Sequence, residues 1–113
     1  MSRLQLLSLC ACLALAGSAA GLAQKKDGKA PDPAKGKEIF TQCAVCHNTA
    51  NDDKKIGPSL KGLFGKAKLP TGKKLNDQTV LNQINKGGNG MPSFKDMLSD
   101  EQKANVLAYL KTL

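Results

Sequence analysis

The sequence predicts a small all-α domain of three to four short helices joined by long loops. Three segments each combine a helix-start signal with apolar residues at helical spacing, and no stretch alternates apolar and polar residues as a strand would. The segments between them are rich in Gly, Pro, Asn and Asp, which favour turns. A chain of 113 residues has room for one such domain.

The first expected helix opens at Asp32 and Pro33 and runs to about Cys43, because Asp caps a helix and Pro suits its first position. Asn76 caps the second helix, which ends before Gly87. One face of this second helix should carry its apolar residues, Val80, Leu81 and Ile84.

The last expected helix opens at Ser99, which has Gln102 three positions later in the spacing of a capping box. Apolar residues recur along it at helical spacing. These residues should face the core: Val106, Leu107, Tyr109, Leu110 and Leu113.

The strongest chemical pattern is Cys43-Ala44-Val45-Cys46-His47. Two thiols three positions apart lie on one side of a helical turn, and the histidine follows at once, which is the pattern of covalent attachment of a c-type haem. Each thiol would form a thioether to one porphyrin vinyl group, and the imidazole would bind the iron. We therefore expect the helices and loops to enclose one covalently bound haem c with its iron.

Other chemistries use similar residues. A thioredoxin-like dithiol needs a strand leading into the motif, whereas the approach here is helical. A structural zinc site needs four ligands, and only Cys43, Cys46 and His47 are at hand. A plain disulfide or inert cysteines would leave the adjacent histidine without a role. The pattern therefore favours haem.

A sixth iron ligand must come from a residue other than histidine, since His47 is unique in the chain. Met, Lys, an external ligand and an open position all remain possible. Met91 lies in a Gly-rich loop before Pro92, which can bring the backbone close to a flat ring. Met97 precedes the last helix, where a role in the core is expected. We favour Met91 as the ligand.

Residues 57–65 contain three glycines and a proline, which suit neither a long helix nor a strand. One interpretation is a folded loop pressed against a flat group, with Leu60, Leu63 and Phe64 as its apolar contacts. The composition is equally compatible with an ordinary loop rich in turns.

The N-terminal residues 1–23 have the layout of a signal peptide, with Arg3, an apolar run and small residues before the expected cleavage. Cleavage after Ala23 is preferred to cleavage after Ala20. A lipoprotein anchored at Cys12 is disfavoured, because the apolar run before it is very short. Residues 24–32 would be a flexible basic linker, and residues 33–113 the folded domain.

The mature chain would be strongly basic. Residues 24–113 hold sixteen Lys, no Arg and all nine acidic residues, a net charge of about +7. The absence of Arg and the scarcity of aromatic residues argue against nucleic acid as a partner. An acidic protein surface fits better, with membrane contact at most peripheral. Solvated surface lysine is the plainer alternative.

Four pieces of the chain occur in the order found in class I c-type cytochromes, and the chain resembles the small bacterial members of that family over residues 33–113. A terminal helix bearing Tyr109 completes the match. The pieces are Gly36–Phe40, Cys43–His47, Gly57–Gly65 and Gly90–Phe94.

The resemblance implies that the carbonyl of Pro58 accepts a hydrogen bond from His47 Nδ1, and that Leu60 packs on the haem. It also implies that the first helix crosses the last one, Gly36 and Phe40 lying against Val106 and Tyr109. One departure concerns Lys66. Many relatives carry Arg there near a haem propionate, and Lys lacks the bidentate fork of Arg.

By the same resemblance the protein would be a soluble, periplasmic, monomeric monohaem electron carrier and not an enzyme. It would shuttle single electrons between redox proteins with acidic faces, such as a reductase and a terminal oxidase. In that case His47 and Met91 ligate the iron. The alternative is a haem-based ligand sensor or a peroxidase-like protein with an open sixth position.

Overall fold

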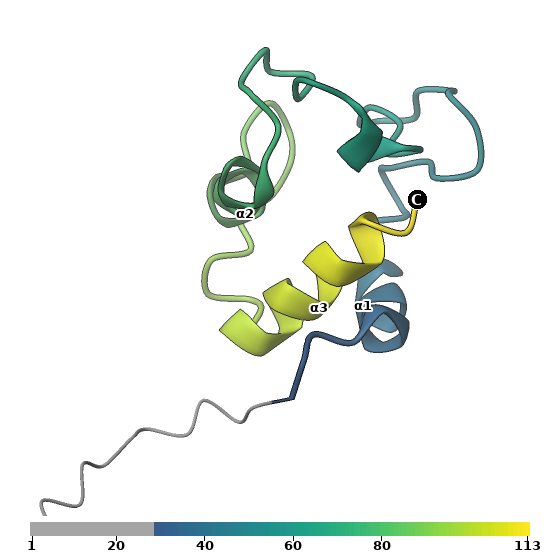
Figure 1. The fold of residues 1–113 in the computed structure, drawn as a ribbon. Coiled ribbons are helices and arrows are strands. Elements are labelled where there is room, and N and C mark those ends of the chain that lie inside the picture. Colours follow the sequence, from purple (N-terminus) through teal and green to yellow (C-terminus); the bar gives the residue numbers. More distant parts are fainter. Residues whose placement is uncertain (1–28) are drawn as a thin grey trace, which may run out of the picture.

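The computed structural model describes residues 29–113, and the expected signal peptide lies outside them. Three α-helices and one short 3₁₀ turn are joined by long loops (Figure 1). The described part contains no strands, only two isolated β-bridges, one between Lys68 and Lys74 and one between Gly88 and Met91. In order along the chain the elements are α1 Pro33–Phe40, η1 Leu63–Gly65, α2 Asp77–Lys86 and α3 Asp100–Leu110.

The helices begin at the expected caps. Asp32 accepts hydrogen bonds from the first turn of α1, and Pro33 takes the first helical position. Asn76 caps α2, and its partner in the reciprocal capping box is Thr79. Ser99 caps α3 in the capping box that the sequence predicts. Local sequence therefore sets where each helix starts.

The first helix is shorter than expected. It ends at Phe40, and the chain continues as hydrogen-bonded turns through residues 41–46. Cys43 N–H and Ala44 N–H both donate to the Phe40 carbonyl, at 2.8 and 2.9 Å. These tighter turns, rather than a helix, lead into the cysteine motif.

The helices α1 and α3 cross in close contact, as the family resemblance implies (Figure 1). A Cβ added at Gly36 would lie 1.9 Å from the Asn105 carbonyl oxygen and 2.9 Å from Tyr109 Cβ, so only glycine allows this approach. One turn later, the rings of Phe40 and Tyr109 pack with their centroids 5.2 Å apart.

The core lies between this helix pair, α2 and the connecting loops. Of the apolar positions expected on α2, Val80 and Ile84 are buried and Leu81 is half-buried. On α3 the buried side chains include Val106, Leu107 and Leu110, whereas Tyr109 and Leu113 are half-buried. The remaining buried apolar side chains come mostly from loops: Phe40, Leu63, Leu69, Phe94 and Leu98.

One sequence-based expectation about a side chain is wrong, and one interpretation left open by the sequence is only partly met. Met97 is 62% exposed and is not in the core, because the neighbouring Leu98 takes the buried position before α3. Phe64 does not line the cavity described below. Its ring instead lies beneath Lys111, whose Nζ is 5.5 Å from the ring centroid.

No helix within residues 29–113 combines the length and apolar character that a membrane span requires.

Candidate functional site

The cysteine motif lies on the turns that follow α1. The His47 and Cys46 N–H groups donate to the Cys43 carbonyl at 2.9 and 3.1 Å, so the motif forms a single compact turn. Cys43 and Cys46 are half-buried free thiols. Cys43 packs against the hydrophobic core. Both thiols are therefore held by the fold and open to covalent attachment.

The protonation of Cys43 differs from that of a catalytic dithiol. Burial raises the pKa of its thiol, and the nearby charge of Cys46 raises that pKa further. Thiol oxidoreductases need a lowered pKa, which provides the thiolate nucleophile at neutral pH. The environment of Cys43 therefore argues against this thiol as the nucleophile of a thiol–disulfide exchange.

His47 is oriented by the loop that follows it. Its Nδ1 lies 2.8 Å from the carbonyl oxygen of Pro58, the contact that the family resemblance implies. When Nδ1–H donates to this carbonyl, the lone pair is on Nε2, which is the nitrogen that is then free to bind a metal. A Cβ added at Gly57 would lie 2.6 Å from His47 Cε1, so the loop backbone presses directly on the imidazole.

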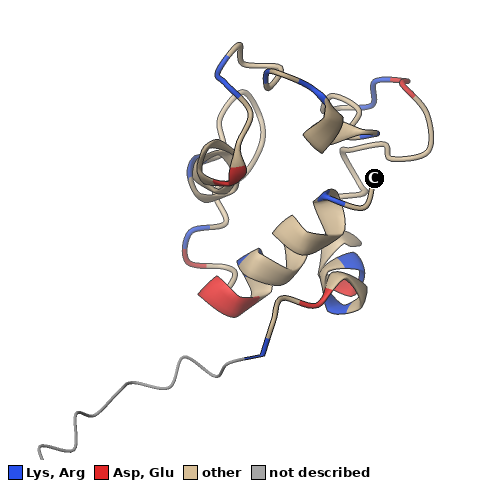
Figure 2. Cartoon of the chain, viewed as in Figure 1, with Lys and Arg blue, Asp and Glu red and all other residues tan. Residues whose placement is uncertain are grey.

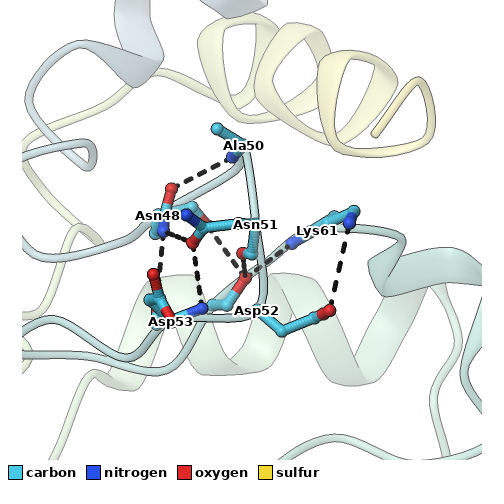
Figure 3. Close-up of polar contacts among 7 residues, drawn as sticks. Asn48, Ala50, Asn51, Asp52, Asp53 and Lys61 are labelled. Carbon is cyan, nitrogen blue, oxygen red and sulfur yellow. Dashed lines mark hydrogen bonds and ion pairs between the residues drawn. The ribbon is translucent and has the colours of Figure 1, made fainter.

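Polar contacts hold this loop in place (Figure 3). Asn48 and Asn51 bond to one another and to the backbone between residues 50 and 53. Buried Ser59 donates its hydroxyl hydrogen to the Asn51 carbonyl at 2.6 Å and accepts from the Lys61 N–H. Lys61 also lies 3.9 Å from Asp52. The carbonyl that orients His47 therefore belongs to a loop with its own internal support.

A mostly apolar cavity of about 310 Å³ lies beside His47. Its walls come from residues 54–63, residues 69–71, α2, the loop after α2 and the last turn of α3. Of the site residues that the sequence suggests, His47, Pro58, Leu60 and Met91 line this cavity. Cys43 and Cys46 do not line it, although Cys46 adjoins it because its carbonyl accepts the Gly57 N–H at 2.8 Å.

Met91 is fixed on the cavity wall by its backbone and by its sulfur. Its N–H and carbonyl both bond to Gly88, at 3.0 and 2.9 Å. Gly87, with φ of 63°, lies so close to the Met91 carbonyl that an added Cβ would be 2.4 Å from that oxygen. Gln83 of α2 donates a hydrogen bond from Nε2 to Met91 Sδ at 3.7 Å. The backbone bonds therefore position the Met91 side chain, and the Gln83 amide polarises its thioether sulfur.

Gln83 is a site residue that the sequence reasoning missed. It lies three positions after Val80 and one before Ile84, which places it beside the buried face of α2. A polar residue next to an apolar helical face was the available signal. The contact with Met91 depends on the loop between them, which helical periodicity does not predict.

The residues of the cavity fit a haem. One imidazole nitrogen is freed by its bond to Pro58, one thioether lines the same apolar cavity, and two free thiols lie on the adjoining turn. Within the described chain, His, Cys, Asp and Glu form no cluster of three that would hold a metal ion by themselves. The donors instead suit a metal that brings its own flat, apolar ligand, and they define a haem-binding domain.

Comparisons with known proteins agree. Residues 31–110 match the family model described as "Cytochrome C oxidase, cbb3-type, subunit III". Cytochrome c6 of Picosynechococcus sp. is 35% identical over 85 residues, which cover 72% of this chain and 73% of that protein. Cytochrome c2 of Rhodopila globiformis is 29% identical over 105 residues, covering 76% and 99%.

A solved structure is also similar. Cytochrome c6 from the diatom Phaeodactylum tricornutum superimposes with a TM-score of 0.55 at 34% identity, covering 72% of this chain and 92% of that one. The chain belongs to the class I c-type cytochromes. Its cofactor is accordingly a covalently bound haem c with its iron, and its fold is the all-α cytochrome c fold.

Proposed function

We propose that this cytochrome is a monohaem electron carrier whose iron is ligated by His47 Nε2 and Met91 Sδ. The proposal depends above all on one observation: His47 and Met91 line the same cavity, whereas Met97 is exposed outside it. Cys43 and Cys46 form the thioethers, and Leu60 packs against the porphyrin. His47 is the only histidine in the chain.

The bound haem supplies a metal that takes up and returns one electron, and the residues of the chain set how easily it does so. Pro58 accepts the Nδ1 proton of His47, which fixes the imidazole and strengthens its nitrogen as a donor. The thioether of Met91 and the apolar walls both favour the reduced state and raise the potential. Gln83 holds the thioether in place.

A haem-based sensor or a peroxidase-like protein with an open sixth position is the alternative function. It would require Met91 to stay off the iron. The backbone bonds of Met91 to Gly88 and the Gln83 contact to its sulfur both favour ligation instead. Electron transfer without a bound substrate, and so without enzymatic activity, is the function that these contacts support best.

Replacing Met91 tests the proposal. Met91→Ala should abolish the weak sulfur-to-iron absorption band of the ferric protein. It should also lower the midpoint potential by on the order of 0.1 V, a modest part of the roughly 0.8 V that axial ligation spans. The matched control is Met97→Ala, which removes an exposed thioether and should change neither property.

The comparison has a clear negative outcome. Rapid cyanide or CO binding by the unmodified protein, without the sulfur-to-iron band, would establish the open-site alternative. A Met91→Ala spectrum identical to the unmodified one would assign the sixth ligand to another residue.

The partners we propose are redox proteins with acidic faces, such as a reductase and a terminal oxidase, met in short-lived encounters. Neither nucleic acid nor a membrane-spanning anchor is part of the proposal, and the carrier would work as a monomer. Residues 1–23 would act as a cleaved signal peptide and direct the protein to the periplasm. Mass determination of the exported holoprotein would test cleavage after Ala23.

A further inference from the structure

Lys103 on α3 has an unusual position for a lysine. Only 8% of its side chain is exposed, while the other lysines among residues 29–113 are exposed. Its Nζ donates a hydrogen bond of 2.8 Å to the backbone carbonyl of Lys95. Asp100 lies 3.9 Å away with a fully exposed side chain, so that ion pair contributes little. The main partner of the buried amino group is therefore a backbone carbonyl in another segment.

That segment, residues 91–98, begins with the proposed iron ligand and connects α2 to α3. Its first half is bonded to α2, since Phe94 N–H donates to the Ile84 carbonyl at 2.9 Å and Ser93 donates to the Asn85 carbonyl. Its second half is bonded to α3 through Lys103. The Met91 segment is thus held at both ends. On the α3 side, the buried lysine adds a hydrogen bond to the packing of Leu98 in the core.

The packing of the helices makes this hold important. The helix α1 packs closely along α3, whereas α2 touches α3 far less. Figure 1 shows α2 and its following loop on the far side of the molecule from α1. The helix before the Met91 segment therefore has limited contact with α3, and the segment itself is held by the buried side chains of Phe94 and Leu98 together with the Lys103 hydrogen bond. A link between residues 91–98 and α3 would restrain its movement away from His47.

Stability alone gives a weak reason for burying a lysine. Removing an amino group from water is costly, and an apolar side chain of similar length would fill the same space without that cost. The hydrogen bond to Lys95 also returns only part of the desolvation energy. A buried lysine at this position is better explained by positioning, because its hydrogen bond fixes the Lys95 carbonyl against α3.

We propose that Lys103 is a positioning residue that holds residues 91–98 against α3 and so keeps Met91 on the iron and external ligands out. The inference rests on the proposed ligation by Met91. Lys103 touches neither the cavity nor the iron ligands and acts only through the Lys95 carbonyl. It controls how often the sixth position opens, not which atoms bind there.

Imidazole binding to the ferric holoprotein tests this role, because imidazole must displace the sixth ligand and, being neutral, is not steered by a change in protein charge. Lys103→Met keeps the length of the side chain and removes the donor. It should raise the affinity for imidazole about tenfold, the factor expected when one charge-assisted hydrogen bond is lost from the closed state. Lys103→Arg keeps hydrogen-bond donors at this position, so its affinity for imidazole should lie between those of Lys103→Met and the unmodified protein.

The matched control is Asn105→Ala, two residues further along α3. Asn105 is also buried, and its Oδ1 accepts the Asp32 N–H at 2.7 Å, so it holds a different segment to the same helix. This variant should lose global stability in denaturant and leave imidazole binding unchanged. Equal imidazole affinities in Lys103→Met and Asn105→Ala at matched stability would overturn the proposal.

Two further measurements separate the possible failures. The sulfur-to-iron band of the unmodified protein reports Met91 ligation, so its absence would overturn the proposed function and this inference with it. A normal band with unchanged imidazole binding in Lys103→Met would overturn only the role of Lys103. If Lys103→Met yields no holoprotein, Lys103→Gln gives a second comparison, since its side chain is one bond shorter and carries no charge.

Discussion

At the scale of single residues, the absence of a side chain at Gly57 determines where the imidazole of His47 can lie. The Gly57 backbone contacts the imidazole ring, and the next residue supplies the carbonyl that accepts its proton. Any side chain at position 57 would push the ring away from that carbonyl. The orientation of the proposed ligand therefore depends on a glycine and not only on the histidine.

Gly57→Ala should disturb the iron site without removing a ligand. Its Cβ would lie 2.6 Å from His47 Cε1 and 2.9 Å from Nδ1, so either the ring or the loop must move. We expect a lower yield of holoprotein and a midpoint potential shifted by some tens of millivolts, because about 59 mV corresponds to a tenfold change in a one-electron equilibrium. Haem content and redox titration measure both.

Gly65→Ala is the control for this substitution. A Cβ at Gly65 meets no atom within 4 Å, so the same chemical change in the same loop should be silent. Equal haem content and equal potential in the two variants would show that the close approach at Gly57 does not matter for the site.

Gln83 offers a second test at this scale. Its amide donates to Met91 Sδ. With Met91 as the proposed iron ligand, this contact withdraws electron density from the sulfur and disfavours the oxidised iron. Gln83→Leu should therefore lower the midpoint potential by about 20–60 mV, the equivalent of one hydrogen bond of about 0.5–1.5 kcal/mol. Redox titration of the holoprotein measures the change.

Gln78→Leu is the appropriate comparison for Gln83→Leu. Gln78 lies on the same helix, but its amide bonds to the exposed side chain of Asn82. Its substitution should leave the potential unchanged. A drop of the same size in both variants would assign the effect to the helix as a whole and not to the sulfur contact.

At the scale of elements, the crossing of α1 and α3 is the contact on which the cysteine motif depends. The motif follows α1 directly, so the position of α1 on α3 determines where the turn and its thiols lie. The crossing requires glycine at position 36, whose Cα faces the backbone of α3 at Asn105. Two helices at opposite ends of the chain thus place a site that belongs to neither of them.

Gly36→Ala should destabilise the fold, although alanine is the better helix former. The gain in helix propensity is about 1 kcal/mol. Against it stands a Cβ 1.9 Å from a backbone oxygen, which puts overpacking at or above the upper end of its usual range of about 1–3 kcal/mol. We expect a net loss of about 2 kcal/mol in the free energy of unfolding, measured in denaturant.

Lys37→Ala provides the reference on the same helix. Lys37 is exposed, so this substitution gains a little helix propensity and meets no neighbour. Its midpoint in denaturant should match the unmodified protein. If the Gly36→Ala protein is as stable as Lys37→Ala, α1 can move away from α3 without loss in the free energy of unfolding, and the close approach at Gly36 does not stabilise the fold.

At the scale of the whole molecule, charge is distributed unevenly. Figure 2 shows lysines along the connection from η1 to α2 and acidic residues in the first turn of α3, with Asp77 the acidic residue in the first turn of α2. Leu69, Pro70 and Thr71 of that connection also line the cavity. Lysines therefore lie near the haem site, where an electron leaves or enters, while the acidic turn belongs to another part of the surface.

Charge reversal tests whether this distribution guides electron transfer. Lys73→Glu should slow oxidation by ferricyanide about threefold at an ionic strength of about 0.1 M, where the Debye length is about 10 Å, because it changes the charge near the cavity by two units. The effect should shrink as salt is added. Stopped-flow kinetics with Lys37→Glu, on exposed α1, provide the comparison, and equal rates for the two variants would remove any role for the position of the charge.

The outcomes for Met97 and Phe64 have the same physical cause. Met97 and Leu98 are adjacent apolar residues, and local sequence does not say which of the two reaches the core; the structure buries Leu98. One of the two interpretations of residues 57–65 placed Phe64 against a flat group with Leu60 and Leu63, but its ring packs under Lys111. Both outcomes depend on residues far away in the sequence, which no local pattern contains.

The sequence by itself determined where the three helices start, their caps and the cysteine motif, because these follow from spacing and from the chemistry of a few residue types. It also favoured Met91 over Met97 as the proposed sixth ligand. The tertiary structure decided which side chains line the cavity. It brought Gln83 to the sulfur of Met91, laid Gly57 against His47 and buried Lys103 beside Lys95. Loops of irregular backbone make these contacts, and their course is fixed by packing and not by periodicity.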